Sequence, residues 1–396
     1  MSLSIPTSDL DLYSDDVLTE PYEHYRRLRD AGPAVWLERH NAWVITRYDA
    51  VRAVLRDWKT FSSASGVALN DTLNAAMQGN TLGSDPPLHD LLRDVVASRM
   101  TSQALRPTQE MIDQRAEMLV ERLVTQHSFD AIQDLAQVLP LSIVPDFIGL
   151  PQEGREHMLE WGEATFDAMG PMNERCTHAL QKLPEVFGYA RQIAASGDLQ
   201  PGSFGAGILE AQRDGRITAA QCPQLFTAYL VPSLDTTISA VGSAIWLFGR
   251  YPDQWNRVQA NPSLIPNAFE EVLRLESPLQ SFTRKATGDY DVEGVSIPSG
   301  SRVVVLFASA NRDERKWENA DTFDVTRNTS GHLGFGYGIH LCAGASLARL
   351  EGQAILGALA RRVEQFELGT STRKLNNVIR GLSTLAITVH ATTKSS

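Results

Sequence analysis

Residues 335–344 read FGYGIHLCAG and are the most informative ten residues of the chain. Glycines and an aromatic residue precede Cys342, which opens a helix predicted over residues 343–361. Glycines allow the backbone to turn tightly beneath a sulfur atom, and the N–H groups at a helix N-terminus stabilise a thiolate. The loop is therefore suited to a cysteine thiolate that binds a metal ion, whereas an isolated cysteine is more often a small buried apolar residue.

The composition excludes several classes of protein. The chain has 396 residues, of which 43% are hydrophobic and 21% charged, as in ordinary globular proteins. Its 36 Lys and Arg residues against 47 Asp and Glu residues give a net charge of −11, which disfavours a nucleic acid or an anionic membrane as a partner. The cysteines Cys176, Cys222 and Cys342 form no CxxC pair, which excludes a disulfide framework and a cysteine-rich zinc site.

The first 20 residues have neither a basic segment nor an apolar run, so they are unlike a signal peptide or a membrane anchor. No later stretch approaches the roughly 20 uninterrupted apolar residues of a membrane span. We therefore expect a soluble, monomeric protein of the reducing cytoplasm.

Strand signals cluster at the two ends of the sequence, and helical periodicity fills the middle. A polar turn at residues 40–41 predicts a hairpin within residues 34–48, and residues 62–87, which contain no Lys or Arg, are predicted to be a long functional loop with room for a short helix. Further strands are expected over residues 289–298, 301–308 and 384–390. The pattern predicts a mainly α chain with small β-sheets (α+β), organised as one catalytic domain over residues 1–396. This domain is expected to contain an N-terminal β region at about 30–60, a helical core at about 88–275, and a β and cysteine-ligand region at about 280–396.

The cysteine segment resembles the cysteine-ligand loop of the cytochrome P-450 family, Phe-x-x-Gly-x-His-x-Cys-x-Gly, at every fixed position. The resemblance implies the cytochrome P-450 fold, in which haem b lies between a long I helix and this loop. It implies that the Cys342 thiolate is the axial iron ligand, that Phe335 packs beneath the sulfur, and that His340 contacts a haem propionate. It also implies a haem-thiolate monooxygenase, because a thiolate ligand favours O–O cleavage.

Cations for the haem carboxylates are implied by position. His89 and Arg93, in HDLLR, are similar to the family's C-helix motif, and Arg284, in FTRKAT, is similar to its strand arginine. Each of them read alone would be a surface charge. Together with His340 they would supply four donors to two propionates, which is a reasonable number for a partly buried site.

The segment FEEVLR places Glu271 and Arg274 three residues apart on one helical face. Such a pair is usually a solvated salt bridge. Its place before the cysteine loop resembles the family's buried Glu-x-x-Arg pair, which a third arginine completes. Arg327, in FDVTR, is the candidate for that structural role.

A helix predicted over residues 224–251 contains Asp235 and Thr236. Read alone, Thr236 would bond a carbonyl one turn earlier and Asp235 would meet an arginine. By resemblance to the I helix, the two are a catalytic acid–alcohol pair that relays protons to O2, the co-substrate. The chain has Pro232-Ser233 where the family usually has Ala-Gly, so Ser233 either contacts the substrate or caps a freed carbonyl.

Residues 9–18 and 164–173 resemble the branch of the family that O-demethylates para-substituted benzoates. A flat apolar slot for an aromatic ring would be lined by Phe166, Met169, Leu279 and Phe282, with Ser233 beside it. This branch holds the carboxylate with arginine and serine groups, but the corresponding positions here are Thr227, Ala228 and Val231. Because a buried carboxylate needs polar partners, the substrate is predicted to be either a para-substituted benzoate held by hydroxyls, amides or water, or a neutral methoxyphenol or alkylphenol.

The implied reaction is O-demethylation or hydroxylation with two electrons from NAD(P)H, delivered by an external reductase and a [2Fe-2S] or similar ferredoxin. Basic residues that could dock the ferredoxin are Arg99, Arg106 and Arg349. Two alternatives stay open: hydroxylation of a terpenoid, fatty acid or polyketide intermediate, and a haem-based sensor without turnover. The Asp-Thr pair argues against the sensor, which would need no proton relay.

Overall fold

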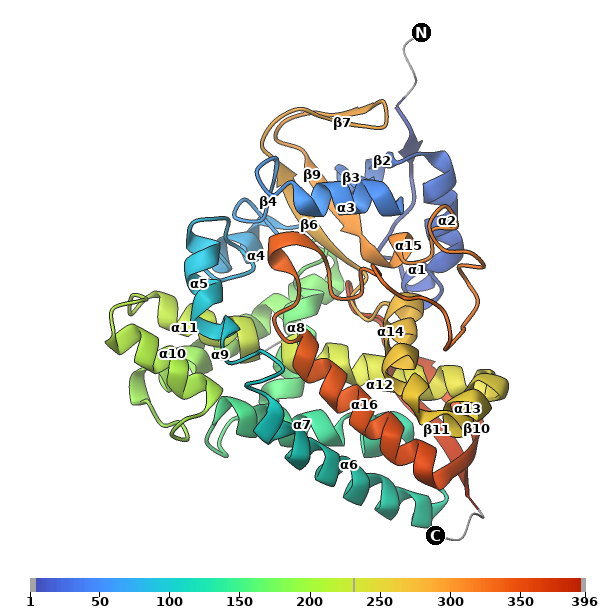
Figure 1. Cartoon of the computed structure of the whole chain (residues 1–396). Coiled ribbons are helices and arrows are strands. Elements are labelled where there is room, and N and C mark those ends of the chain that lie inside the picture. Colours follow the sequence, from blue (N-terminus) through green and yellow to red (C-terminus); the bar gives the residue numbers. More distant parts are fainter. Residues whose placement is uncertain (1–4, 231, 393–396) are drawn as a thin grey trace.

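The computed structural model describes residues 5–230 and 232–392, with a sheet-rich region at one end and helices at the other (Figure 1). The α-helices are α1 (Asp15–Thr19), α2 (Tyr22–Ala31), α3 (Tyr48–Arg56), α4 (Asp71–Ala76), α5 (Leu88–Ala97), α6 (Arg106–Gln126), α7 (Val138–Ile148), α8 (Met158–Asp167), α9 (Glu174–Ser196), α10 (Phe204–Arg213), α11 (Gln221–Leu230), α12 (Pro232–Arg250), α13 (Pro252–Ala260), α14 (Ile265–Glu276), α15 (Phe307–Ala310) and α16 (Ala345–Arg362). Shorter turns of 3-10 helix occupy Glu38–His40, Arg155–His157, Pro262–Leu264 and Gly338–His340, and a π-helical segment spans Ala131–Ala136.

The larger sheet joins strands from both ends of the sequence. Its strands are β1 (Thr7–Ser8), β2 (Ala34–Leu37), β3 (Ala42–Ile45), β4 (Phe61–Ser62), β6 (Ser281–Ala286) and β9 (Arg302–Leu306), in the order β1-β2-β3-β9-β6-β4. β2 and β3 form the predicted antiparallel hairpin, and β3 lies parallel to β9 with Trp43 opposite Val303. The predicted N-terminal hairpin and the predicted strand at 301–308 therefore belong to one sheet.

Two smaller sheets complete the β structure of the described residues. One has the order β10-β11-β5, with β5 (Ser128–Asp130), β10 (Val363–Arg373) and β11 (Leu382–Ala391), and the other pairs β7 (Tyr290–Val292) with β8 (Val295–Ile297). The predicted final strand corresponds to β11, and the predicted strands at 289–298 and 301–308 correspond to β7, β8 and β9. The predicted fold class, mainly α with small sheets, is confirmed.

The strands β1, β4, β5 and β10 were not predicted, and β6 was indicated only by the resemblance of Arg284 to a strand arginine. β10 reads VEQFELGTSTR and follows α16 without an interrupting proline or glycine, and most of its residues are exposed. Its extended conformation comes from pairing along most of its length with β11, from Val363 opposite Ala391 to Arg373 opposite Leu382. Such distant pairing leaves no local signal in the sequence.

The helix predicted over residues 224–251 corresponds to α11 and α12, and residue 231, at which a substrate-facing side chain was predicted, lies outside the described residues. Most residues of α12 are buried, and this helix packs against α7, α8, α14, α16 and β10. By length and hydropathy, residues 131–148 and 221–250 could each cross a membrane, but 56% and 76% of those windows are buried inside the fold. Their apolar character is accounted for by core packing.

Candidate active site

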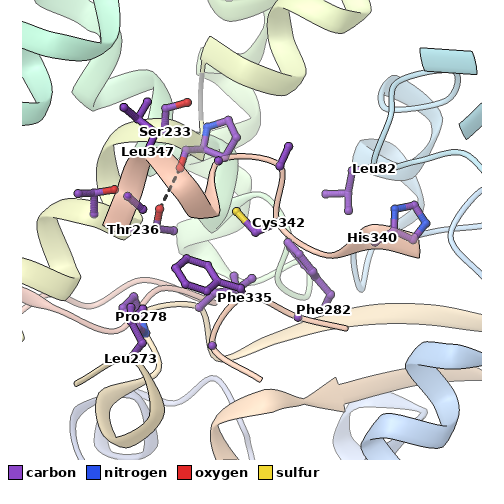
Figure 2. A pocket seen from close by; sticks show the side chains of 18 of the residues that line it. Leu82, Ser233, Thr236, Leu273, Pro278, Phe282, Phe335, His340, Cys342 and Leu347 are labelled. Atoms are coloured by element: carbon purple, nitrogen blue, oxygen red, sulfur yellow. Dashed lines mark hydrogen bonds between the residues drawn. The ribbon is translucent and has the colours of Figure 1, made fainter. Parts of the chain in front are cut away.

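A cavity of about 220 Å³ lies where α12, β6, the loop 335–344 and the start of α16 meet. Figure 2 shows the Cys342 sulfur inside this space, with Phe335 on one side of it and Thr236 of α12 facing it. Phe166, Leu279 and Phe282 also line the cavity, as predicted. Residues that were predicted from four distant segments therefore line one cavity.

The backbone of the cysteine loop is held tightly. The Cys342 N–H donates to the Phe335 carbonyl at 2.9 Å. Gly338 has a φ of 76°, and a side chain there would collide with the Leu55 carbonyl, so the turn requires glycine. Burial raises the pKa of the Cys342 thiol, whereas the N–H groups of Gly344 and Ala345 lower it. A bound metal cation would deprotonate such a thiol outright.

Four basic side chains converge beside the loop. The rings of His89 and His340 lie edge to face with centroids 4.6 Å apart, and Arg93 donates to the Leu341 carbonyl at 2.7 Å. Burial, followed by the charges of Arg284, His89 and Arg93, lowers the pKa of His340 to about 2. Burial likewise lowers the pKa of Arg284 to about 10, against the opposing charge of Asp85. Arg93 and Arg284 bring two positive charges to this cluster, and neither has a carboxylate bonded to it among the described residues.

The same four basic residues indicate whether a haem group would fit beside the cysteine loop. The Nε2 atoms of His89 and His340 are buried and have no hydrogen-bond partner within the described residues. Orphaned buried polar atoms of this kind are rare unless a ligand satisfies them. Two haem carboxylates would supply the missing acceptors and charges, and the Cys342 sulfur in the same cavity would supply the iron ligand. The residues therefore fit the group that the resemblance implies.

The predicted Glu-Arg-Arg set is brought together. Arg274 donates to both Glu271 oxygens, at 2.7 and 2.8 Å, and both side chains are fully buried. Arg327 donates to Glu271 at 3.0 Å and also to the carbonyls of Glu318 and Asn319. Arg274 itself reaches further carbonyls at residues 311 and 320. The set thus attaches the segment 311–327, which leads to the cysteine loop, to α14.

The acid and the alcohol on α12 have different surroundings. The Thr236 hydroxyl lines the cavity and donates to the Pro232 carbonyl at 3.0 Å, as expected from the sequence read without the resemblance. Asp235 is buried and is not among the cavity-lining residues. Its Oδ1 accepts from Lys374 at 2.9 Å, and its Oδ2 has no partner among the described atoms. Burial raises the pKa of Asp235, and Lys374 opposes that shift.

Ser233 lines the cavity and donates to the Tyr229 carbonyl at 2.5 Å. Both predicted roles of this residue are therefore compatible with its position: it caps a carbonyl and faces the cavity.

Met169 is the exception among the predicted pocket residues. It does not line the cavity but packs with Val67, Leu73 and Val378 in an apolar cluster that also contains the cavity-lining Phe166.

Three residues in or next to the candidate site were not predicted from the sequence. Lys374 lies in the connection between β10 and β11, and no sequence spacing links it to Asp235. Thr81 lines the cavity from the predicted loop, and its buried hydroxyl lies beside the Tyr229 phenol. Glu351 lines the cavity from α16 and is 1% exposed, with an oxygen that has no partner among the described residues. The four-residue recurrence of Leu347, Glu351 and Ile355 on one buried helical face could have revealed the last of these.

Two of the three arginines that were predicted to dock the ferredoxin form salt bridges within the protein. Arg99 pairs with Glu210 at 2.8 Å, and Arg349 forms two bonds to Glu270, at 2.6 and 3.0 Å, while lying over the Phe335 ring. Arg106 begins α6 and is exposed. Two of the three charges are therefore neutralised within the protein and contribute little to a basic surface.

Comparisons with known proteins agree with this geometry. Residues 11–149 and 137–387 match the family described as cytochrome P-450. The chain is 39% identical to cytochrome P-450 CYP199A2 of Rhodopseudomonas palustris, over 97% of this chain and 94% of that protein. It is 31% identical to the monooxygenase PikC of Streptomyces venezuelae, over 97% and 94% of the two chains. The solved structure of cytochrome P-450 CREJ in complex with (4-ethylphenyl) dihydrogen phosphate is similar, with a TM-score of 0.87, 28% identity and coverage of 94% and 98%.

Proposed function

Because the chain belongs to the cytochrome P-450 family, we propose that it is a monooxygenase acting on a small para-substituted aromatic compound, by O-demethylation or hydroxylation. One observation carries the proposal: the Cys342 sulfur and the Thr236 hydroxyl face the same cavity, whose remaining wall includes the aromatic rings of Phe166 and Phe282. An iron ligand, a proton-handling hydroxyl and an aromatic surface are thereby within one small volume.

We assign haem-holding roles to named side chains. Cys342 would ligate the iron, and Phe335 would pack beside the sulfur, since it lines the cavity and bonds the Cys342 N–H through its carbonyl. His89, Arg93, Arg284 and His340 would bind the carboxylates. When bound, haem supplies the activation of O2 that allows one oxygen atom to be inserted into a C–H bond.

The protein's own contribution to the reaction is proton handling. Lys374 bonds Asp235 at 2.9 Å and lies 3.5 Å from Glu163, and about half of the Glu163 side chain is exposed. Glu163, Lys374 and Asp235 thus form a chain of titratable groups from solvent to the buried turn of α12 that carries Thr236. Asp235 would pass protons toward the cavity, and the Thr236 hydroxyl would hold the proton at the cavity wall.

The aromatic substrate is supported by the cavity and by two relatives. Phe166, Leu279 and Phe282 provide an apolar wall suited to the face and edge of a ring. The 39% identical CYP199A2 and the CREJ complex with a 4-ethylphenyl compound belong to the same family. The family also includes PikC and a structure with bound testosterone, so hydroxylation of a terpenoid, fatty acid or polyketide is the alternative that the test must separate.

We further propose that electrons come from NAD(P)H through an external reductase and a [2Fe-2S] or similar ferredoxin, and that the protein is a cytoplasmic monomer. The acidic total charge of −11 is compatible with an acidic ferredoxin only if docking uses a local basic surface.

The function is tested with the haem-loaded protein, a ferredoxin and its reductase, NADH and O2. Incubation with at least one of the two compounds 4-methoxyphenol and 4-methoxybenzoate should release formaldehyde and the corresponding demethylated phenol in equal amounts. Lauric acid, a polyketide macrolactone and a monoterpene serve as comparison substrates. Turnover of one of these with none of either aromatic compound would sink the aromatic assignment while leaving the monooxygenase in place.

A further inference from the structure

Positive charge around the cavity is confined to one cluster. Among the described lining residues, the cationic or titratable basic groups are Arg93, Arg284 and His340. Both arginines act electrostatically on His340, as does His89, whose ring lies against it. Two haem carboxylates would satisfy this cluster, so it offers no further cation to a charged substrate.

Lys374, the cation that contacts Asp235, is also paired with carboxyl groups of the protein. Lys374 does not line the cavity, and its ammonium group is shared between Asp235 at 2.9 Å and Glu163 at 3.5 Å. A substrate carboxylate on this side would find two protein carboxyls already competing for one cation. Burying an anion without a cation or several donors is costly.

The hydroxyl groups of Ser233 and Thr236 on α12 offer acceptors rather than donors. Ser233 donates its hydrogen to the Tyr229 carbonyl, and Thr236 donates to the Pro232 carbonyl. A hydroxyl has only one hydrogen, so these oxygens present lone pairs to a ligand. Lone pairs repel a carboxylate but accept a hydrogen bond from a neutral hydroxyl.

Thr81 lines the cavity beside Tyr229 and is 6% exposed. Burial raises the pKa of the Tyr229 phenol, whereas Arg93 and a hydrogen bond with the Thr81 hydroxyl lower it. Two hydroxyls that bond each other use only one of their two hydrogens. The second hydrogen of this pair is therefore left for a ligand that accepts a hydrogen bond.

We propose that the substrate is an uncharged phenol, that Thr81 hydrogen-bonds its hydroxyl group, and that the cavity rejects carboxylates. This inference rests on the proposed function and names the substrate class of the same site. It also selects between the two classes left open by the sequence, the neutral phenols and the benzoates.

The test is a spin-state titration of the ferric, haem-loaded protein with three ligands of similar shape: 4-methoxyphenol, 4-methoxytoluene and 4-methoxybenzoate. We expect 4-methoxytoluene to bind about 5- to 10-fold more weakly than 4-methoxyphenol, since it lacks one neutral hydrogen bond. We expect 4-methoxybenzoate to bind about 100-fold more weakly or to give no shift. Thr81→Val should reduce the affinity for the phenol to that for the toluene and leave the toluene unaffected.

Ser243→Ala is the matched control, because Ser243 lies on α12, is fully buried with an unpartnered hydroxyl and does not line the cavity. It should change none of the three affinities. Ala228→Arg, which introduces a cation at a lining position, should instead confer benzoate binding.

The outcomes are distinguishable. Benzoate binding as tight as phenol binding would overturn the inference and leave the proposed function standing. Equal affinities for the phenol and the toluene would overturn the hydroxyl contact, as would a haem-loaded Thr81→Val variant that keeps the full phenol affinity. No spin shift with any of the three compounds would overturn the proposed aromatic function itself.

Discussion

At the scale of single residues, Glu351 is the most unusual group in the cavity wall. It is fully buried, and burial alone raises its pKa to about 8. A carboxyl whose pKa is higher in the folded protein than in the unfolded chain favours folding in its protonated form. Its contribution to stability is therefore complete below about pH 4.5 and is lost as the pH rises toward 8.

Glu351→Gln should remove this dependence. The stability difference between the variant and the unmodified protein should grow in the variant's favour from pH 5 to pH 8, by at most roughly 1.4 kcal/mol per pH unit. Denaturant unfolding of the haem-loaded proteins at several pH values measures it. Glu364→Gln, which alters an exposed glutamate, is the control. Parallel stability curves for Glu351→Gln and the unmodified protein would show that Glu351 does not titrate in this range.

The proposed role of Thr236 in proton handling can be tested by replacing this one residue. Thr236→Ala removes the hydroxyl at the cavity wall, so electrons should be consumed without matching product. We expect the ratio of product to NADH to fall about 10-fold or more, in the range of a lost general acid–base group. Thr236→Ser keeps a hydroxyl and should recover most of the ratio. Full coupling in Thr236→Ala, measured as formaldehyde formed against NADH oxidised, would contradict the assigned role.

At the scale of elements, a buried ion pair is one of several contacts between α14 and residues 311–327, which also include hydrogen bonds from Asn267 to the carbonyls of Val325 and Arg327. Arg274→Met would leave the fully buried Glu271 carboxylate with Arg327 and the Asp324 N–H as its partners, and the free energy of unfolding should fall by about 3–5 kcal/mol. The double variant Glu271→Gln with Arg274→Met removes the stranded charge and should recover part of the loss. Chemical denaturation of the three proteins decides this, and an additive double variant would argue against the coupling.

Elements with local sequence signals could be predicted from the sequence. The hairpin at 34–45 and the helix after Cys342 carry local signals, namely a polar turn between β-prone runs and a helix N-terminus after glycines. The positions in the cysteine loop, in FEEVLR and at Asp235 and Thr236 follow fixed spacings. β10 and Lys374 were missed because their conformation and partners come from residues far away in the sequence. Met169 was misplaced because membership of the apolar cluster that contains Phe166 does not by itself put a side chain on the cavity wall.

At the scale of the whole molecule, the proposed contact of Arg284 with haem would couple haem binding to the fold. Arg284 is a buried cation that donates to the carbonyl of Thr283, with no carboxylate bonded to it among the described residues. Arg284→Met should therefore stabilise the haem-free protein while it weakens haem retention roughly 10- to 100-fold, through loss of a charge-assisted bond. Melting temperatures of both forms and haem transfer to apomyoglobin measure the two effects.

Lys285→Met is the control for this pair of measurements, because the neighbouring side chain on β6 points to the opposite face of the sheet. It should alter neither haem retention nor the stability of the haem-free protein in the manner of Arg284→Met. A haem-free Arg284→Met protein that is less stable than the unmodified protein would show that the cation is compensated within the fold.

The parallel pairing of β3 with β9 has a consequence for how the chain is made. About 260 residues separate Trp43 from Val303, and at roughly 5–20 residues per second the ribosome delivers the partner strand some tens of seconds after the hairpin. During that interval the apolar edge of β3, at Trp43, Val44 and Ile45, has no neighbour to cover it. The nascent chain is therefore most prone to aggregate until β9, in the last quarter of the sequence, emerges, and slower growth at low temperature with added chaperone should raise the yield of folded protein.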